Sequence, residues 1–143
     1  MTAWTVPVVQ VVAASPVFAV SGPANISGTT GTITRSDAKT FVVDIPVTNS
    51  GGSATSALNA RLTWTPAGDT TIDSVTAVAG WTKVANEYRW TAIAQATATT
   101  PQPFKVTVKI KNTGNNGAVK TGGTMAVVFT EAATSATVTK SFS

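Results

Sequence analysis

The chain has 143 residues, of which 10 are Lys or Arg and 6 are Asp or Glu, giving a formal charge of +4 at pH 7. It contains no cysteine and no histidine, which excludes disulfides, thiolate metal sites and any catalytic set that needs an imidazole. Hydrophobic residues make up 43% of the chain and charged residues only 11%, so we expect one folded domain with at most a weak preference for acidic partners.

The first 20 residues form an apolar segment, MTAWTVPVVQVVAASPVFAV. Pro7 and Pro16 interrupt it, which excludes a membrane-spanning helix. A signal peptide fits poorly, because no Lys or Arg precedes Arg35. Two interpretations remain for residues 1–20: the first strand of the domain, beginning near Val17, or an extended arm that binds a neighbouring subunit.

The arm interpretation names the residues that would touch the partner. Trp4 would be its anchor, because tryptophan is over-represented among residues that carry binding energy. The valines beside it would line the strand or groove contact. The predicted arm contacts are Trp4, Val6, Val8, Val9, Val11 and Val12.

Residues 21–143 read as a series of short strands separated by turns rich in Gly, Asn and Pro. The parity of the apolar residues slips near Ser74 and Val75, which predicts a β-bulge. Pro46 cannot donate a ladder hydrogen bond, so its strand is expected at an edge or bulged there. The expected strands are 32–35, 41–48, 58–65, 72–78, 81–85, 88–92, 103–111, 125–130 and 137–142.

The clearest strand is PFKVTVKIK, residues 103–111. Its apolar residues alternate with polar ones, which is typical of an antiparallel strand with one buried face. Lys105, Lys109 and Lys111 share the other face. We favour a role in preventing sheet-to-sheet aggregation over a docking surface for an acidic partner. No aromatic residue alternates with these lysines, so nucleic acid is not an expected partner.

The four tryptophans have different expected positions. Trp64 and Trp90 are in phase with the apolar faces and are predicted to be core residues. Trp81 and Trp4 have no such phase. They either close the ends of the sandwich, which we favour, or form an exposed patch that stacks on sugars or docks protein.

No catalytic, cofactor or metal motif stands out. Asp69 and Asp73 bracket two threonines, but a calcium loop needs more oxygen ligands, and a turn explains both residues better. We therefore expect no enzymatic activity, no cofactor and no metal.

Three segments, FVVDIPVTNSGGSA, ALNARLTWTP and PFKVTVKIKNTGN, resemble the immunoglobulin-like repeats of bacterial and archaeal surface proteins. The resemblance covers about Lys39 to Phe142 and implies an all-β fold, an immunoglobulin-like antiparallel β-sandwich, without catalytic residues. The apolar N-terminal arm sets this chain apart from those repeats.

A β-sandwich with such an arm is also similar to the immunoglobulin-like accessory proteins of tailed-phage virions. That similarity implies a virion structural protein, a bacteriophage capsid decoration protein on the particle surface. Its partners would be capsid or other virion subunits, with self-association as a further option. The alternatives are an adhesion or surface-layer module outside the cell, and a carbohydrate-binding module that uses Trp81 and Trp4.

Overall fold

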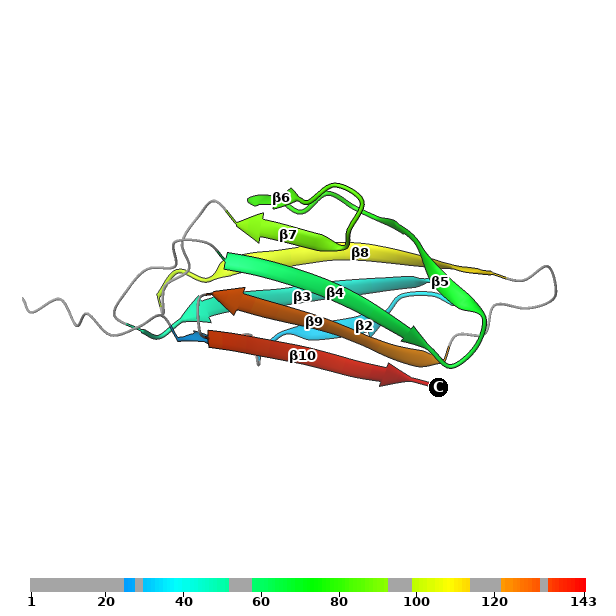
Figure 1. The fold of residues 1–143 in the computed structure, drawn as a ribbon. Coiled ribbons are helices and arrows are strands. Elements are labelled where there is room, and N and C mark those ends of the chain that lie inside the picture. The colour runs from blue at the N-terminus through cyan, green and yellow to red at the C-terminus, as the bar shows by residue number, and fades with distance from the viewer. Residues whose placement is uncertain (1–24, 28–29, 52–57, 93–98, 114–121, 132–133) are drawn as a thin grey trace, which may run out of the picture.

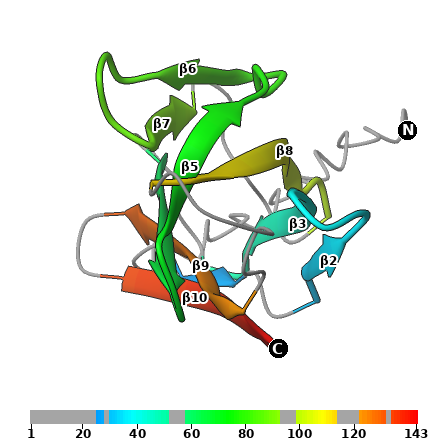
Figure 2. The same ribbon diagram turned by 90° about the vertical axis from the view of Figure 1, so that its right-hand side faces the viewer.

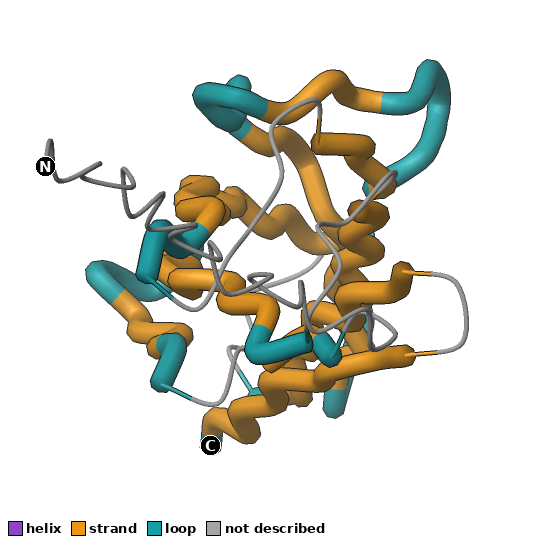
Figure 3. The backbone as a smooth tube through the Cα atoms, turned by 90° about the vertical axis from the view of Figure 1, so that its left-hand side faces the viewer, coloured by secondary structure: helices purple, strands orange, loops and turns teal. Residues whose placement is uncertain are grey.

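The structure is a computed structural model that describes residues 25–27, 30–51, 58–92, 99–113, 122–131 and 134–143. These residues form strands joined by loops, and none of them is helical (Figure 3). The predicted arm or first strand, residues 1–20, lies outside the described residues.

The strands form two antiparallel sheets that lie face to face (Figures 1 and 2). Sheet I has the order β1-β3-β8-β5, and β2 pairs with β3 beside β1. Sheet II has the order β10-β9-β4-β7-β6. The strands of sheet I are β1 (Ile26–Ser27), β2 (Thr32–Arg35), β3 (Thr40–Asn49), β5 (Thr70–Val75) and β8 (Gln102–Asn112). Those of sheet II are β4 (Leu58–Pro66), β6 (Trp81–Lys83), β7 (Arg89–Ala92), β9 (Gly123–Glu131) and β10 (Thr134–Phe142).

This arrangement confirms the all-β sandwich and is compatible with an immunoglobulin-like one. In immunoglobulin-like sandwiches the second and fifth strands pair in one sheet, and the third, sixth and seventh pair in the other. Here β3 pairs with β8, while β4, β9 and β10 are neighbours. The β6–β7 hairpin extends sheet II beyond β4, and β5 forms the outer edge of sheet I.

The core comes from strict alternation along the two central strands of sheet I. The apolar residues of β3 and β8 are almost completely buried, while the residues between them face outward. This confirms the burial pattern expected from the sequence. The buried side chains are Phe41, Val43, Ile45, Val47, Phe104, Val106, Val108 and Ile110.

Phe104 is the centre of an aromatic cluster that joins the two sheets. Its ring meets Trp81, Trp90 and Phe129 edge to face, at centroid distances of 5.1, 5.3 and 5.4 Å. Aromatic pairs in this geometry add about 0.5 to 1.5 kcal/mol each to the free energy of burial. Three residues of sheet II therefore pack on one side chain of sheet I.

Pro46 is in an interior strand, so the expected edge position or bulge is wrong. It lies directly opposite Pro103 in the β3–β8 ladder. The Ile110 N–H donates to the carbonyl oxygen of Lys39, so these two residues form a hydrogen-bonded pair in the same register. Because hydrogen-bonded and non-hydrogen-bonded pairs alternate along an antiparallel ladder, Pro46 and Pro103 form a non-hydrogen-bonded pair, where no N–H is needed. On its other side, β3 pairs with β2 through Phe41–Asp44 and with β1 through Thr48–Asn49, so Pro46 falls in the gap between them.

The bulge predicted near Ser74 is confirmed. The register of β5 against β8 shifts between Ile72 and Ser74. Asp73 and Ser74 are both exposed, so this shift ends the simple alternation of β5. Asp73 pairs with Lys111 on the outer face.

Candidate functional site

The three lysines of the predicted row lie on the outer face of sheet I, and two of them have acidic partners there. Lys105 Nζ is 3.0 Å from Asp44 Oδ2, and Lys111 Nζ is 3.0 Å from Asp73 Oδ1. The lysine side chains remain 68% and 60% exposed, so these ion pairs are weak. The row is therefore partly neutralised by its own sheet, which leaves less net positive charge for an acidic partner.

Trp81 is a core residue. It is 8% exposed, and its indole N–H donates to the carbonyl oxygen of Pro103 at 2.8 Å. Trp90 is also buried, as expected, whereas Trp64 is only partly buried at the end of β4. The sugar-stacking interpretation of Trp81 is therefore wrong. Trp4 and the valines of the predicted arm lie outside the described residues.

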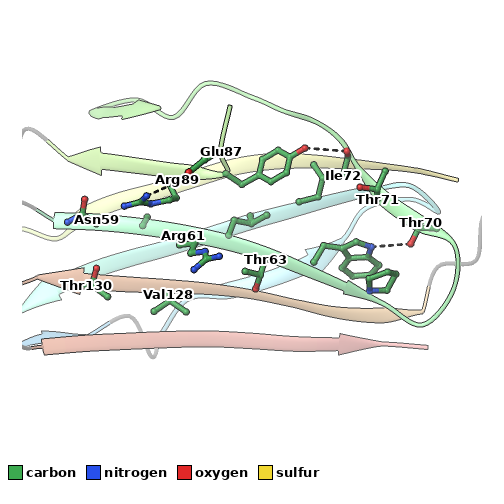
Figure 4. A pocket seen from close by; sticks show the side chains of 15 residues that line it. Asn59, Arg61, Thr63, Thr70, Thr71, Ile72, Glu87, Arg89, Val128 and Thr130 are labelled. Carbon is green, nitrogen blue, oxygen red and sulfur yellow. Dashed lines mark hydrogen bonds and ion pairs between the residues drawn. The ribbon is translucent and has the colours of Figure 1, made fainter. Parts of the chain in front are cut away.

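A hollow with a volume of about 1080 Å³ runs over β4 in sheet II (Figure 4). Its floor is the outer face of β4, and β9 forms one wall. The turn before β7 forms the other wall, and β5 closes one end. Its polar lining comes from Asn59, Arg61, Thr63, Thr70, Thr71, Glu87, Arg89 and Thr130.

Two aromatic side chains connect sheet II to β5 of sheet I beside this hollow. β7 pairs with Leu58–Arg61 of β4, and the Leu62 N–H donates to the carbonyl oxygen of Tyr88. In the described part of the chain, the remainder of β4 has no partner strand on that side. The Trp64 indole N–H donates to Thr70 Oγ1 at 3.1 Å, and the Tyr88 hydroxyl donates to the carbonyl oxygen of Ile72 at 3.3 Å. Both bonds reach from sheet II to β5 (Figure 4), so they fix the end wall of the hollow.

Arg61 and Arg89 are direct cross-strand partners in the floor of the hollow. Arg89 Nη1 is 2.9 Å from Glu87 Oε2, in the tight turn where Asn86 has a positive φ of 61°. No sequence pattern reveals this pair, because β5 and β6 separate the two strands in the chain. Only the pairing of β4 with β7 brings the arginines together.

A second surface feature is the β10 edge of sheet II. Among the described residues, β10 pairs with β9 alone. The Ala67 N–H donates to the carbonyl oxygen of Gly122, so these two residues form a hydrogen-bonded pair between β4 and β9. Hydrogen-bonded and non-hydrogen-bonded pairs alternate along an antiparallel ladder, so this pair determines which residues of β9 bond to β4 and which bond to β10. It follows that the backbone N–H and C=O groups pointing away from β9 are those of Ser135, Thr137, Thr139 and Ser141.

A groove of about 510 Å³ runs beside this edge, between β2 and β10. Its walls include Ile33, Val138 and Phe142, which contribute apolar surface. Arg35 lies at the base, with its guanidinium 5.3 Å from the centroid of Phe142 and 3.4 Å from the carbonyl oxygen of Ser143. The groove and the β10 edge together form an extended, partly apolar strip.

Neither a metal site nor a membrane-spanning helix is found where the structure describes the chain. No three or more acidic side chains cluster there in a way that could hold a metal ion. No helix of the length and apolarity of a membrane span occurs there either. No protein-family model matches the sequence, and no curated protein is significantly similar to it.

Proposed function

We propose that the protein is a non-enzymatic structural component of a virus particle, a capsid decoration protein of a tailed phage. The proposal is supported by the sequence resemblance to virion accessory proteins and by the β-sandwich. The observation that carries the binding mechanism is the β10 edge beside its groove.

In the described part of the chain, the residues of β10 carry little of the usual protection against strand addition. Natural edge strands are kept from pairing by being short, or by prolines, bulges or several lysines. β10 has nine residues in continuous register with β9, contains no proline and carries one charged residue, Lys140. A strand of this kind is suited to accept another strand by main-chain hydrogen bonds.

The occupant that we propose is the N-terminal segment of a neighbouring subunit in the assembly. Val8 to Ala14 is an uncharged, proline-free stretch with valines at both parities, so an added strand would have apolar side chains on both faces. One face would cover Val138 and Phe142 in the groove, and the other would be covered by the capsid or by the next subunit. The arm would thus link copies of the protein to each other or to the particle.

A proline at position 139 tests this binding mode. The N–H of Thr139 points away from β9, so Thr139→Pro removes a donor from the β10 edge without removing a bond of the β9 ladder. We expect Thr139→Pro to stay folded and to lose binding to purified particles. Thr139→Ala keeps the N–H and should bind like the unmodified protein. Unchanged binding of the proline variant would reject strand addition at β10.

Deletion of residues 1–20 tests the arm itself. The shortened protein should remain a soluble sandwich by circular dichroism and should no longer co-sediment with particles. Mass spectrometry of purified virions should find the N-terminal peptide in many copies per particle. Recovery of the native protein from the cell envelope, with a terminus beginning near Gly22, would instead favour the surface-layer or adhesion module.

A further inference from the structure

Arg61 and Arg89 form the type of cross-strand pair that brings two Cα atoms closest together. The Leu62 N–H donates to the carbonyl oxygen of Tyr88 at 2.9 Å, so Leu62 and Tyr88 form a hydrogen-bonded pair. Arg61 and Arg89, one position further on, are then a non-hydrogen-bonded pair, in which Cα atoms are about 4.5 Å apart. Like charges at such a pair destabilise a sheet.

Only one of the two charges is neutralised in the described part of the protein. Glu87 pairs with Arg89 at 2.9 Å. Arg61 makes no ion pair with any described residue, and Figure 4 shows its side chain turned toward Val128 on β9, away from Glu87. The floor of the hollow therefore holds one guanidinium that has no counter-ion among the described residues.

The surroundings of Arg61 suit a small anion. Asn59 and Thr63 flank it on β4, and Thr130 lies nearby on β9 (Figure 4). The outward-facing strand residues of sheet II that the structure describes carry hydroxyl, amide, small apolar or arginine side chains, and none is acidic. A carboxylate entering the hollow would meet hydrogen-bond donors and no fixed negative charge except Glu87.

We propose that this hollow is a carboxylate site that receives an acidic side chain of a protein partner, with Arg61 as its principal ligand. A planar guanidinium binds a carboxylate through two parallel hydrogen bonds, which is the strongest pairing open to an exposed arginine. The inference rests on the proposed assembly function in one respect, namely that the partner is a protein.

The test uses the full-length, ¹⁵N-labelled protein and capped hexaglutamate as the probe. We expect the peptide to shift the Arg61 Nε–H resonance and the backbone amides of β4 and β9. Capped hexaglutamine should leave them unchanged. Arg61→Gln should weaken hexaglutamate binding about tenfold, as expected when a bidentate charged pair is lost.

Lys109→Gln is the matched control, because it removes one exposed cation from the opposite sheet. It should weaken binding by less than about twofold, as screened surface charges act weakly at a distance. Equal losses in the two variants would mean that the peptide follows net charge, and the site would be rejected. Absence of any Arg61 shift would reject it too.

Glu87→Gln should change the affinity for hexaglutamate in the opposite direction to Arg61→Gln. Without Glu87, Arg89 is free to join Arg61, so hexaglutamate should bind a few times more tightly than to the unmodified protein. Asp73→Asn on sheet I changes the net charge by the same amount as Glu87→Gln and should increase the affinity for hexaglutamate less. Tighter binding of polygalacturonate than of hexaglutamate at the same resonances would reject a protein carboxylate as the ligand.

These experiments distinguish a failure of the carboxylate site from a failure of the proposed virion role. Loss of hexaglutamate binding in Arg61→Gln, together with no particle binding by the unmodified protein, would reject the virion role and keep the carboxylate site. Particle binding that Arg61→Gln leaves intact, without any effect on hexaglutamate, would reject the carboxylate site alone.

Discussion

The indole N–H of Trp81 donates a 2.8 Å hydrogen bond to the carbonyl oxygen of Pro103, so a side chain of sheet II is bonded to the backbone of sheet I. The same ring packs edge to face on Phe104. Trp81 therefore closes one end of the sandwich both by apolar contact and by a hydrogen bond.

Substitution of Trp81 should reveal the two contributions separately. Trp81→Ala is expected to lower the free energy of unfolding by about 3 to 5 kcal/mol, as for other buried large aromatic residues. Trp81→Phe keeps much of the contact but leaves the Pro103 carbonyl without its donor, at a cost of about 1 to 3 kcal/mol. Urea unfolding monitored by circular dichroism measures both. An alanine variant as stable as the unmodified protein would contradict a core position.

Gly123 should not tolerate any side chain. Its φ is +152°, and an added Cβ would lie 2.5 Å from Trp64 Cη2 and 2.8 Å from the carbonyl oxygen of Thr65. Gly123→Ala must displace the Trp64 ring, which would also break its bond to Thr70. We expect a loss of about 2 kcal/mol or more, within the range for strained backbone and overpacked sites.

Gly122 is the control for that substitution. The nearest atom to a Cβ added there is the Ala67 Cβ at 3.3 Å, a contact that a small shift of the chain relieves. Gly122→Ala should therefore cost clearly less than Gly123→Ala in the same unfolding experiment. Equal losses would show that the Trp64 contact does not limit position 123.

The lysine ion pairs of sheet I are expected to contribute little to stability. Lys105→Gln breaks the pair with Asp44, but the two side chains are 68% and 45% exposed, and surface pairs of this kind are worth about 0.2 to 1 kcal/mol. The difference between the two proteins should shrink further in high salt, because salt screens exposed charges. A loss that is larger than this, or that persists in high salt, would contradict the weak pairing.

Asp37 should titrate below its ordinary pKa. The Lys39 N–H donates to Asp37 Oδ1 at 2.8 Å, and this bond, followed by one from the Thr40 side chain, lowers the pKa of Asp37 from 3.8. Because the folded-state pKa is lowered, the stabilisation is complete above the unfolded-state pKa and is lost as the pH falls through the folded-state pKa. NMR titration of the carboxyl carbon measures this directly, and a midpoint at or above the ordinary value would contradict the bond.

Much of the fold was predictable because a strand with one buried face has apolar residues at every second position of the sequence. The alternation in β3 and β8 and the parity slip in β5 are direct consequences of which face touches the core. The position of Trp81 was harder to assign, since a three-residue strand such as β6 is too short to show a phase.

The candidate site was less accessible from sequence, because it depends on which strands become neighbours. After β4 the chain crosses to sheet I as β5 and returns as the β6–β7 hairpin. Nothing in the residues around Arg61 and Arg89 indicates that this return places them opposite each other. The β10 edge depends on topology in the same way, since an edge strand and an interior strand can have the same alternation.

The facing prolines of β3 and β8 have a consequence for how the two strands find their alignment. In any pairing shifted by one residue, Pro46 and Pro103 would occupy successive positions of the ladder, and one of them would stand where an N–H is required. Such a slip would therefore cost a main-chain hydrogen bond in addition to exposing an apolar face. Pro46 and Pro103, which have no backbone N–H to donate, thus favour the observed register of β3 and β8 over a register shifted by one residue.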